Sequence, residues 1–231
     1  MKTALNPKHH KPQLPSAILP ILAILALAAG LWFGLGAFET KLTNDPVVLH
    51  SATALSQPRP LQSFTLTNDE RQPFNLDSLK KEWTFLAFGY THCPDICPTT
   101  LTVFNQIDHQ LKDQGSGDNA GFVFISVDPE RDSLERLGPY IDYFNPEIVG
   151  ATAPHQALRQ LTDQLGILYQ RVDQPGSSSS DYLVDHSASM LLVDPQGRLA
   201  AIFSAPHSPD LMARDFISIA NSANLVMENQ Q

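Results

Sequence analysis

The sequence predicts an α/β sandwich preceded by a single N-terminal transmembrane helix. Two continuous apolar runs, Thr84–Tyr90 and Gly121–Val127, are typical of buried strands in a sheet that is covered on both faces. Segments with helical periodicity alternate with these runs, as they do in α/β proteins. One longer apolar stretch stands near the N-terminus, apart from this pattern. The 231 residues, 42% of them hydrophobic, leave room for one domain and accessory segments.

The apolar stretch Ala17–Phe38 is predicted to be a membrane anchor. As a helix it would extend about 33 Å, slightly more than the roughly 30 Å hydrocarbon core of a bilayer. Lys2, Lys8 and Lys11 precede it, and no acidic residue occurs before or within it. Because positive charge stays on the cytoplasmic side, residues 1–16 are predicted to be cytoplasmic and the C-terminal part exported. This describes a single-pass protein of the cell inner membrane whose large domain faces the periplasm.

A cleaved signal peptide is the competing interpretation of the same stretch. The apolar part of a signal peptide is shorter, about 7–15 residues, although Gly34–Ala37 loosely resembles a cleavage site. After the stretch, residues 39–60 mix prolines with polar side chains and are predicted to form a tether. The folded domain is expected over residues 61–231.

Within this domain the expected elements follow one another in a regular order. Strands are predicted over Phe64–Thr67, Thr84–Tyr90, Gly121–Val127, Ile148–Ala151, Ser187–Val193 and Leu199–Phe203. Helices are predicted over Thr99–Lys112, from Asp132 to about Phe144, from Pro154 to Gly166, and from Ser208 or Asp210 to about Val226. Alternating strands and helices that end in a hairpin and a helix predict a thioredoxin-like sandwich.

Three local signals support these boundaries. Asp132-x-x-Glu135 resembles an N-cap with its reciprocal glutamate. Asp194-Pro-Gln-Gly197 is a turn sequence between the last two strands. The serine-rich segment Asp173–Asp181 is expected to be a hairpin connection or a loop.

The charge of the chain argues against nucleic acid as a partner. The formal net charge is −9, and three of the 15 basic residues precede the predicted anchor whereas none of the 24 acidic residues does. The exported part is therefore strongly negative and would repel a phosphate backbone. No basic stripe with interleaved aromatic residues offsets this repulsion.

The only two cysteines, Cys93 and Cys97, mark the candidate site. They lie between a predicted buried strand and a predicted helix, where open α/β sheets place functional groups. Asp95 is expected to be the N-cap of that helix, and the helix N-terminus is expected to lower the thiol pKa of Cys97 and also that of Cys93. One helical turn between the two residues permits either a disulfide or joint ligation of one metal ion.

A copper ion fits this pair better than zinc or an iron–sulfur cluster, because those sites generally require four ligands. Two thiolates and one imidazole suit a copper site of low coordination number. Among the eight histidines, His186 is favoured because it precedes the apolar strand Ser187–Val193, in a turn that faces the cysteine loop of a thioredoxin-like sandwich. The alternative is that His186 is an ordinary surface histidine. His92 adjoins Cys93, but the side chain of a direct neighbour generally points elsewhere.

At these residues the chain resembles a known family. The runs GYTHCPDICPTTL, ISVDPERD and DHSASMLLVDPQGRL closely resemble the Sco/SenC proteins, the copper-binding assembly factors of cytochrome c oxidase. The resemblance extends from roughly Gln62 to Phe216. It implies a thioredoxin-like fold, a copper ion as Cu(I) or Cu(II) held by Cys93, Cys97 and His186, and a role in building the binuclear copper centre of the oxidase. The implied partners are the copper-centre subunit of the oxidase, other copper carriers and thiol reductants.

Two other functions use a cysteine pair on such a fold. A thiol–disulfide oxidoreductase that reduces its client through Cys93 and Cys97 is the main alternative, and whether the chain is an enzyme stays open at this point. A peroxiredoxin is disfavoured because the residues three before the cysteines, Tyr90 and Pro94, do not match its P-x-x-x-[ST]-x-x-C pattern. A purely structural disulfide would close so short a loop that it would constrain the unfolded chain little.

Two acidic residues near these motifs, Asp185 and Asp128, each have two possible roles. Asp185 could orient the imidazole of its neighbour His186, or it could be a solvated turn residue. Asp128 could face the site, but a turn role before Pro129 is favoured.

Overall fold

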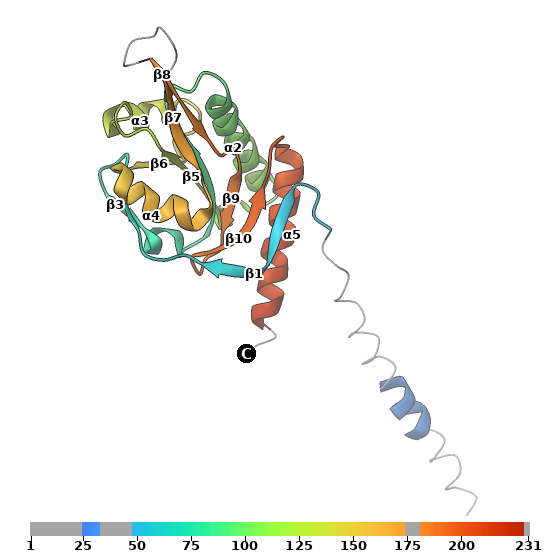
Figure 1. The fold of residues 1–231 in the computed structure, drawn as a ribbon. Helices are drawn as coiled ribbons and strands as arrows, with labels where there is room; N and C mark the ends of the chain where they lie inside the picture. Colours follow the sequence, from blue (N-terminus) through green and yellow to red (C-terminus); the bar gives the residue numbers. More distant parts are fainter. Residues whose placement is uncertain (1–24, 33–47, 174–180, 229–231) are drawn as a thin grey trace, which may run out of the picture. The chain divides into compact units, whose positions relative to one another are not determined.

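The computed structural model describes residues 25–32, 48–173 and 181–228 (Figure 1). The chain separates into two compact units, Met1–Pro46 and Val47–Gln231. In the first unit, residues 25–32 are helical and exposed, and the rest of the predicted anchor Ala17–Phe38 lies outside the described residues. Among the helices that are described, none combines the length and the hydropathy needed to cross a membrane.

An eight-stranded sheet forms the centre of the second unit. Its strands are β1 Ala52–Pro60, β2 Thr65–Asn68, β3 Pro73–Asn75, β4 Trp83–Gly89, β5 Ala120–Ser126, β6 Val149–Thr152, β9 Met190–Val193 and β10 Arg198–Phe203. Across the sheet their order is β1-β10-β9-β4-β5-β6-β2-β3. Strands β4, β5 and β6 are parallel, whereas the remaining pairs are antiparallel. Every residue of β4 is buried, as its continuous apolar run predicted.

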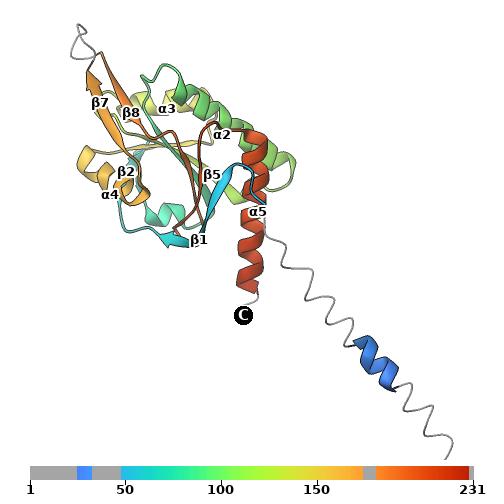
Figure 2. The same cartoon turned by 45° about the vertical axis from the view of Figure 1, so that its right-hand side comes forward.

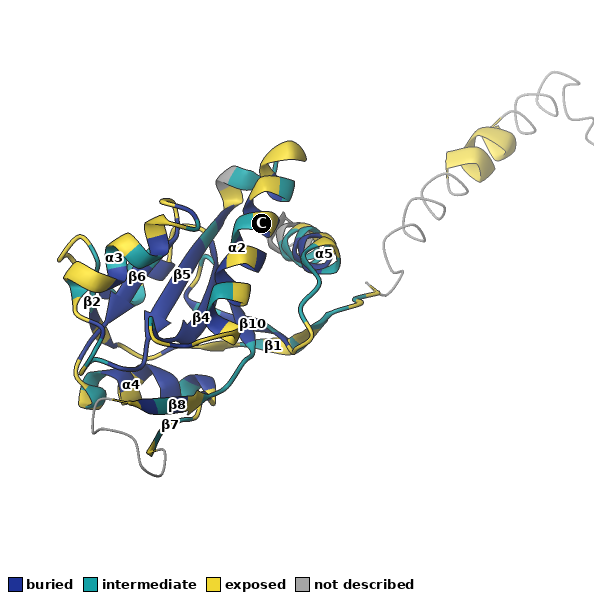
Figure 3. Ribbon diagram, turned by 90° about the horizontal axis from the view of Figure 1, so that it is seen from above, coloured by how far each residue is buried: buried dark blue, intermediate teal, exposed yellow. Residues whose placement is uncertain are grey.

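Helices cover both faces of this sheet (Figure 3). They are α2 Ile96–Asp113, α3 Leu134–Asp142, α4 His155–Leu165 and α5 Pro209–Glu228. Helices α2, α3 and α5 lie on one face, and α4 lies on the other (Figure 3). Short 3-10 turns over Leu76–Leu79 and Gly117–Asn119 complete the domain. The predicted α/β sandwich is therefore confirmed.

The core between the sheet and the helices α2 and α5 is rich in aromatic rings. Phe85 of β4 is fully buried, and its ring centroid lies 5.3–6.3 Å from four other phenylalanine rings. These are Phe104 of α2, Phe122 of β5, Phe203 of β10 and Phe216 of α5. Rings at such separations add to the stabilisation that burial provides. This cluster fixes β4, and so the loop that follows it, against α2.

A second, two-stranded sheet lies beside α4 and apart from α5 (Figure 2). It consists of β7 Tyr169–Asp173 and β8 Tyr182–His186, which pair antiparallel with Tyr169 opposite His186. The predicted hairpin connection Asp173–Asp181 lies outside the described residues except at its two ends. Neither β7 nor β8 was among the strands predicted from the sequence.

The structure corrects the predicted tether over residues 39–60, because Ala52–Pro60 is strand β1 and pairs with β10 at the edge of the sheet. Its two prolines disfavoured a strand in the sequence, but an edge strand tolerates them because one side makes no ladder hydrogen bonds. Asp215 of α5 holds the start of this strand. Its carboxylate accepts hydrogen bonds from the amides of His50, Ser51 and Ala52 at 2.7–3.0 Å.

Two of the predicted helix starts also need correction. Ser133, not Asp132, occupies the N-cap position of α3, and Asp132 is buried with 1% of its surface exposed. Pro154 is the N-cap residue of α4 rather than its first helical residue. The helix α4 does end at Gly166, whose φ of 71° is in the left-handed region that glycine favours.

Candidate metal centre

The candidate centre begins where β4 ends. Tyr90 follows the strand directly, and its carbonyl accepts a hydrogen bond from the Cys93 amide at 3.2 Å. This bond closes a turn that brings Cys93 back over the end of the sheet. Cys93 is buried, with 8% of its surface exposed.

Cys97 lies in the first turn of α2 and is only 1% exposed. Its amide donates to the sulfur of Cys93 at 3.4 Å, so one free N–H group of the helix start points at that sulfur. Asp95 does occupy the N-cap position, as predicted, but its side chain makes no capping hydrogen bond. The anionic group that the helix N-terminus favours here is therefore the thiolate of Cys93.

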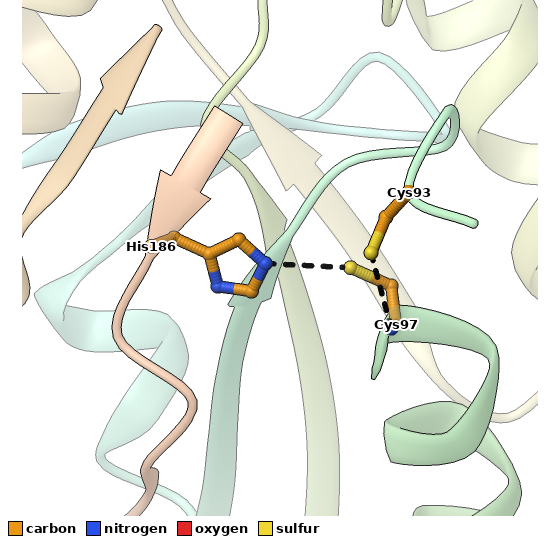
Figure 4. Close-up of side chains that lie close together, drawn as sticks. All are labelled: Cys93, Cys97 and His186. Atoms are coloured by element: carbon orange, nitrogen blue, oxygen red, sulfur yellow. Dashed lines mark hydrogen bonds between the residues drawn. The ribbon is translucent and has the colours of Figure 1, made fainter. Parts of the chain in front are cut away.

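His186 is the last residue of β8 and reaches the cysteines from the other side (Figure 4). Its Nε2 lies 3.6 Å from the sulfur of Cys97. The two sulfurs and one nitrogen of His186 all lie within 4.8 Å of one another. The three predicted site residues are thus brought together, although 89 positions separate Cys97 from His186.

The two thiols differ in pKa. A hydrogen bond from Cys97, together with contributions from His186 and from the amides of Asp95 and Cys97, lowers the pKa of Cys93 to about 3 despite its burial. The pKa of Cys97 is raised, because its proton bonds to Cys93 and because the group is buried. The prediction of a lowered pKa was therefore wrong for Cys97: the single charge that the helix N-terminus stabilises resides on Cys93.

Gly89 makes the close approach of Cys97 to the sheet possible. A Cβ at this position would lie 2.6 Å from the sulfur of Cys97 and 2.7 Å from Cζ of Phe124. Both distances are far below ordinary van der Waals contact. No role was predicted for Gly89 from the sequence, and the only sequence signal for one is its position shortly before the cysteines.

Asp132 holds the loop between Tyr90 and Cys93. Its carboxylate accepts hydrogen bonds from the amide and the hydroxyl of Thr91 at 2.8 and 2.6 Å, and from the hydroxyl of Ser126 at 2.6 Å. The buried carboxylate thereby ties the loop to the end of β5. Because Asp132 directly precedes a helix, its sequence position predicted an N-cap role. It gave no indication that the carboxylate holds the cysteine loop.

The other described histidines lie outside the centre. His92 is exposed, and its Nε2 accepts a hydrogen bond from Arg136 at 2.8 Å. His155 contacts the Tyr169 hydroxyl, and His207 contacts the Ala188 carbonyl. His109 is exposed on α2. Within the described ranges, the cluster of potential metal ligands consists of Cys93, Cys97 and His186.

The structure also decides between the alternative roles of Asp185 and of Asp128. The Nδ1 of His186 contacts the carbonyl oxygen of Ser187 at 3.1 Å, whereas Asp185 is exposed. Asp128 is buried, its carbonyl accepts the turn hydrogen bonds of the following residues, and its carboxylate contacts Arg131 and Tyr182. The favoured turn role of Asp128 is correct but incomplete.

The donor set fits a soft metal ion. Bonds of about 2.0–2.3 Å from one ion to two sulfurs and a nitrogen would separate the three ligand atoms by roughly 3.5–4 Å in a trigonal arrangement. Separations within 4.8 Å require only a small closure to reach this geometry. Thiolate and imidazole ligands favour Cu(I), zinc and related ions over harder cations. No carboxylate belongs to the described cluster, which further disfavours magnesium and calcium.

Comparison with known proteins identifies the family. The sequence profile described as SCO1/SenC matches residues 53–221. This chain belongs to the SCO1/SenC family. The match includes β1 from Thr53 onward, all three residues of the candidate centre and most of α5.

Relatives of this SCO1/SenC chain come from bacteria and from mitochondria. A protein of Stutzerimonas stutzeri described as a putative copper-binding protein is 33% identical over 195 residues, which cover 84% of this chain and 90% of the relative. The mitochondrial SCO1 homolog 1 of Arabidopsis thaliana is 34% identical over 147 residues, which cover 64% of this chain. The matched region is 43% of the Arabidopsis protein, so that relative is much longer than the shared part.

A solved structure shows the same fold. The crystal structure of Arabidopsis thaliana ScoI with copper bound is similar to this chain with a TM-score of 0.65 and 31% identity. The similarity covers 69% of this chain and 97% of the other. The thioredoxin-like fold predicted for the SCO1/SenC domain is thereby confirmed.

Proposed function

We propose that this SCO1/SenC protein binds one copper ion through Cys93, Cys97 and His186 and assists assembly of the binuclear copper centre of cytochrome c oxidase. The observation that carries the proposal is the convergence of two sulfurs and one imidazole nitrogen within 4.8 Å. Membership of the SCO1/SenC family supports copper as the cargo and the oxidase as the destination. The partner would be the oxidase subunit that carries this copper centre.

The chemistry of the centre supports delivery as well as binding. Three ligands leave copper coordinatively unsaturated, so a thiolate of a client protein could join before a ligand of this protein leaves. Cys93, at 8% exposed, is the more accessible of the two cysteines. A client would therefore approach from the side of Cys93.

We also propose that Ala17–Phe38 anchors the protein in the cell inner membrane with the copper-binding domain on the periplasmic side. The support is the uncharged length of this stretch and the position of Lys2, Lys8 and Lys11 before it. Protease added to intact spheroplasts should then digest the domain. Protection of the domain in intact spheroplasts would contradict this orientation.

Copper binding can be tested on the purified, fully reduced protein. Titration with Cu(I) against a competing chelator should give one tightly bound copper per chain. The Cys93→Ser/Cys97→Ser variant should lose this binding, because no soft donor remains at the centre. His109→Ala, which removes an exposed histidine of α2, should bind as the wild type does. Tight stoichiometric binding by the double cysteine variant would refute the assignment.

A thiol–disulfide oxidoreductase is the second candidate function. The observation in its favour is the lowered pKa of Cys93, to about 3, beside a second free thiol. A thiolate of this kind can attack a client disulfide, after which Cys97 would resolve the mixed disulfide. The reaction would oxidise Cys93 and Cys97 to a disulfide and reduce the client to two thiols. Unlike copper binding, this chemistry does not require His186.

A further inference from the structure

The hairpin that carries His186 is not a part of the main sheet. Strand β8 pairs with β7, and the two form a separate two-stranded sheet. The cysteines, in contrast, are fixed by β4 and α2 in the centre of the domain. The distance between the imidazole and the two sulfurs therefore depends on what holds the second edge of β8.

Tyr90 holds this edge and the cysteine loop at the same time. Its hydroxyl lies near the backbone amide of Val184 on that edge. Its carbonyl accepts the hydrogen bond from the Cys93 amide. Its ring meets the imidazole of His186 edge-on, with centroids 6.0 Å apart and planes at 90°. One residue, 2% exposed, thus contacts both halves of the centre.

Arg131 contacts the same edge of β8 at Tyr182, two residues before Val184. Its guanidinium donates to the Tyr182 carbonyl at 3.0 Å and lies 3.5 Å from the centroid of the Tyr182 ring. A second branch donates to the Asp128 carboxylate at 2.6 Å, and the Tyr182 hydroxyl donates to the other oxygen of that carboxylate at 2.7 Å. Alternate residues of a strand direct their peptide groups to the same edge. The contacts at Tyr182 and Val184 therefore form one series that leads to His186.

We propose that Tyr90 and Arg131 are positioning residues that set the distance from His186 to the two cysteine sulfurs. The proposal rests on the proposed copper function and extends it. Neither residue is a ligand. Tyr90 and Arg131 take the place of the neighbouring strand that β8 lacks and hold the imidazole within reach of an ion bound by the cysteines.

The test uses conservative variants of the full-length reduced protein. Tyr90→Phe removes one hydroxyl, and Arg131→Lys keeps the charge but loses the forked contact to Asp128 and Tyr182. Each should weaken Cu(I) binding by about tenfold, as loss of the groups that orient metal ligands generally does.

Tyr140→Phe is the matched control, because this buried hydroxyl has no hydrogen-bond partner in the described structure. Arg214→Lys, at an exposed arginine of α5, is the control for Arg131. Both controls should bind copper as the wild type does.

A merely structural role is separated from positioning by repeating the measurement in a His186→Ala background. If Tyr90 acts through His186, adding Tyr90→Phe to His186→Ala should weaken binding no further. The Cu(II) form of the single variant should also lose nitrogen coupling in its electron paramagnetic resonance spectrum. Wild-type affinity in Tyr90→Phe, or an equal loss with and without His186, would overturn the proposal. If Arg131→Lys does not fold, the Tyr90→Phe comparison decides alone.

The outcome for the wild type and for His186→Ala separates this inference from the proposed function. Absence of Cu(I) binding by the wild type, or wild-type affinity in His186→Ala, would refute the copper ligand set and the positioning role with it. Normal binding by the wild type, weakened binding by His186→Ala and unchanged binding by Tyr90→Phe would leave the function standing and refute only the positioning role.

Discussion

Cys93 and Cys97 lie in different electrostatic surroundings although they belong to one turn of chain. The amide of Cys97 donates to the sulfur of Cys93, and hydrogen bonding with Cys97 is the largest cause that lowers the pKa of Cys93 to about 3. Cys97 is 1% exposed and retains its proton. In the metal-free reduced protein one thiolate is therefore already present, and copper binding at neutral pH must displace only the proton of Cys97.

This difference predicts the pH dependence of alkylation. In the native apo protein, the rate of Cys93 labelling by iodoacetamide should change little between pH 8 and pH 5, because the thiolate persists above its pKa of about 3. In the denatured protein the rate should fall roughly 10²–10³-fold over the same interval, since an ordinary thiol has a pKa of about 8.5. Peptide mapping by mass spectrometry would assign the label. Preferential labelling of Cys97, or an equally steep fall in the native protein, would contradict the prediction.

Gly89 is expected to tolerate no side chain. The Cβ of Gly89→Ala would lie 2.6 Å from the Cys97 sulfur and 2.7 Å from Phe124, so both must shift. Overpacking of this kind costs about 1–3 kcal/mol of unfolding free energy, and the displaced sulfur should also weaken copper binding. Gly138→Ala in α3 is the control, because its Cβ would meet only an ordinary contact at 3.5 Å. Chemical denaturation and copper competition measure the two effects, and wild-type values for Gly89→Ala would show that the site relaxes freely.

The residues of the centre could be predicted from sequence more readily than those that support it. Two cysteines between a strand and a helix stand out by chemistry alone, and His186 was favoured by its place before an apolar strand and by the family resemblance. Tyr90, Gly89 and the buried Asp132 act through contacts across the fold. No spacing rule indicates such contacts, because their partners lie on other elements.

At the scale of elements, some strands are indicated by their own sequence, whereas others depend on contacts with the rest of the fold. β4 and β5 are buried on both faces, so their apolar runs indicated them directly. β1, β7 and β8 have an exposed face or edge and mixed composition, and none of them was predicted from the sequence. Side chains from other elements hold these strands in place. Asp215 holds the start of β1, and Tyr90 and Arg131 lie along the edge of β8.

The attachment of β1 to α5 leads to a prediction about Asp215. Burial acts to raise the pKa of this carboxyl, but the amides of Ser51, His50 and Ala52 outweigh it and the pKa is lowered. Because the folded-state pKa lies below that of the unfolded chain, the stabilisation is complete above about pH 4 and is lost as the pH falls through the lowered value. Asp215→Asn should reduce the unfolding free energy at pH 7 by about 2–3 kcal/mol, since hydrogen bonds to a charged acceptor are lost.

The pH profile of unfolding tests this assignment. The difference in stability between wild type and Asp215→Asn should shrink as the pH is lowered below 4, because protonation removes the charge from the wild-type carboxyl as well. Hydrogen exchange should report faster opening of the amides at residues 50–52 in the variant. A pH-independent difference, or unchanged exchange at these amides, would show that the carboxylate does not hold β1.

At the scale of the whole molecule, the chain joins two parts of different character. An N-terminal part without acidic residues precedes an acidic domain of the SCO1/SenC family. In that domain, the cysteines and the separately held histidine come from elements that are far apart in the sequence. A function that needs all three groups therefore depends on β8 as well as on β4 and α2, whereas in thiol–disulfide exchange His186 contributes only to the lowered pKa of Cys93.

This dependence predicts different outcomes for His186→Ala under the two candidate functions. If copper handling is the task, the variant should bind copper at least tenfold more weakly, about 1.4 kcal/mol, and cytochrome c oxidase assembly in the producing cells should fail. If thiol–disulfide exchange is the task, Cys93 and Cys97 suffice, and the variant should reduce its client and support assembly. His109→Ala is the control for expression and folding. Oxidase spectra and copper content, measured together in the same cells, report both properties. Normal oxidase assembly alongside confirmed loss of copper binding would refute copper delivery and leave client reduction as the function.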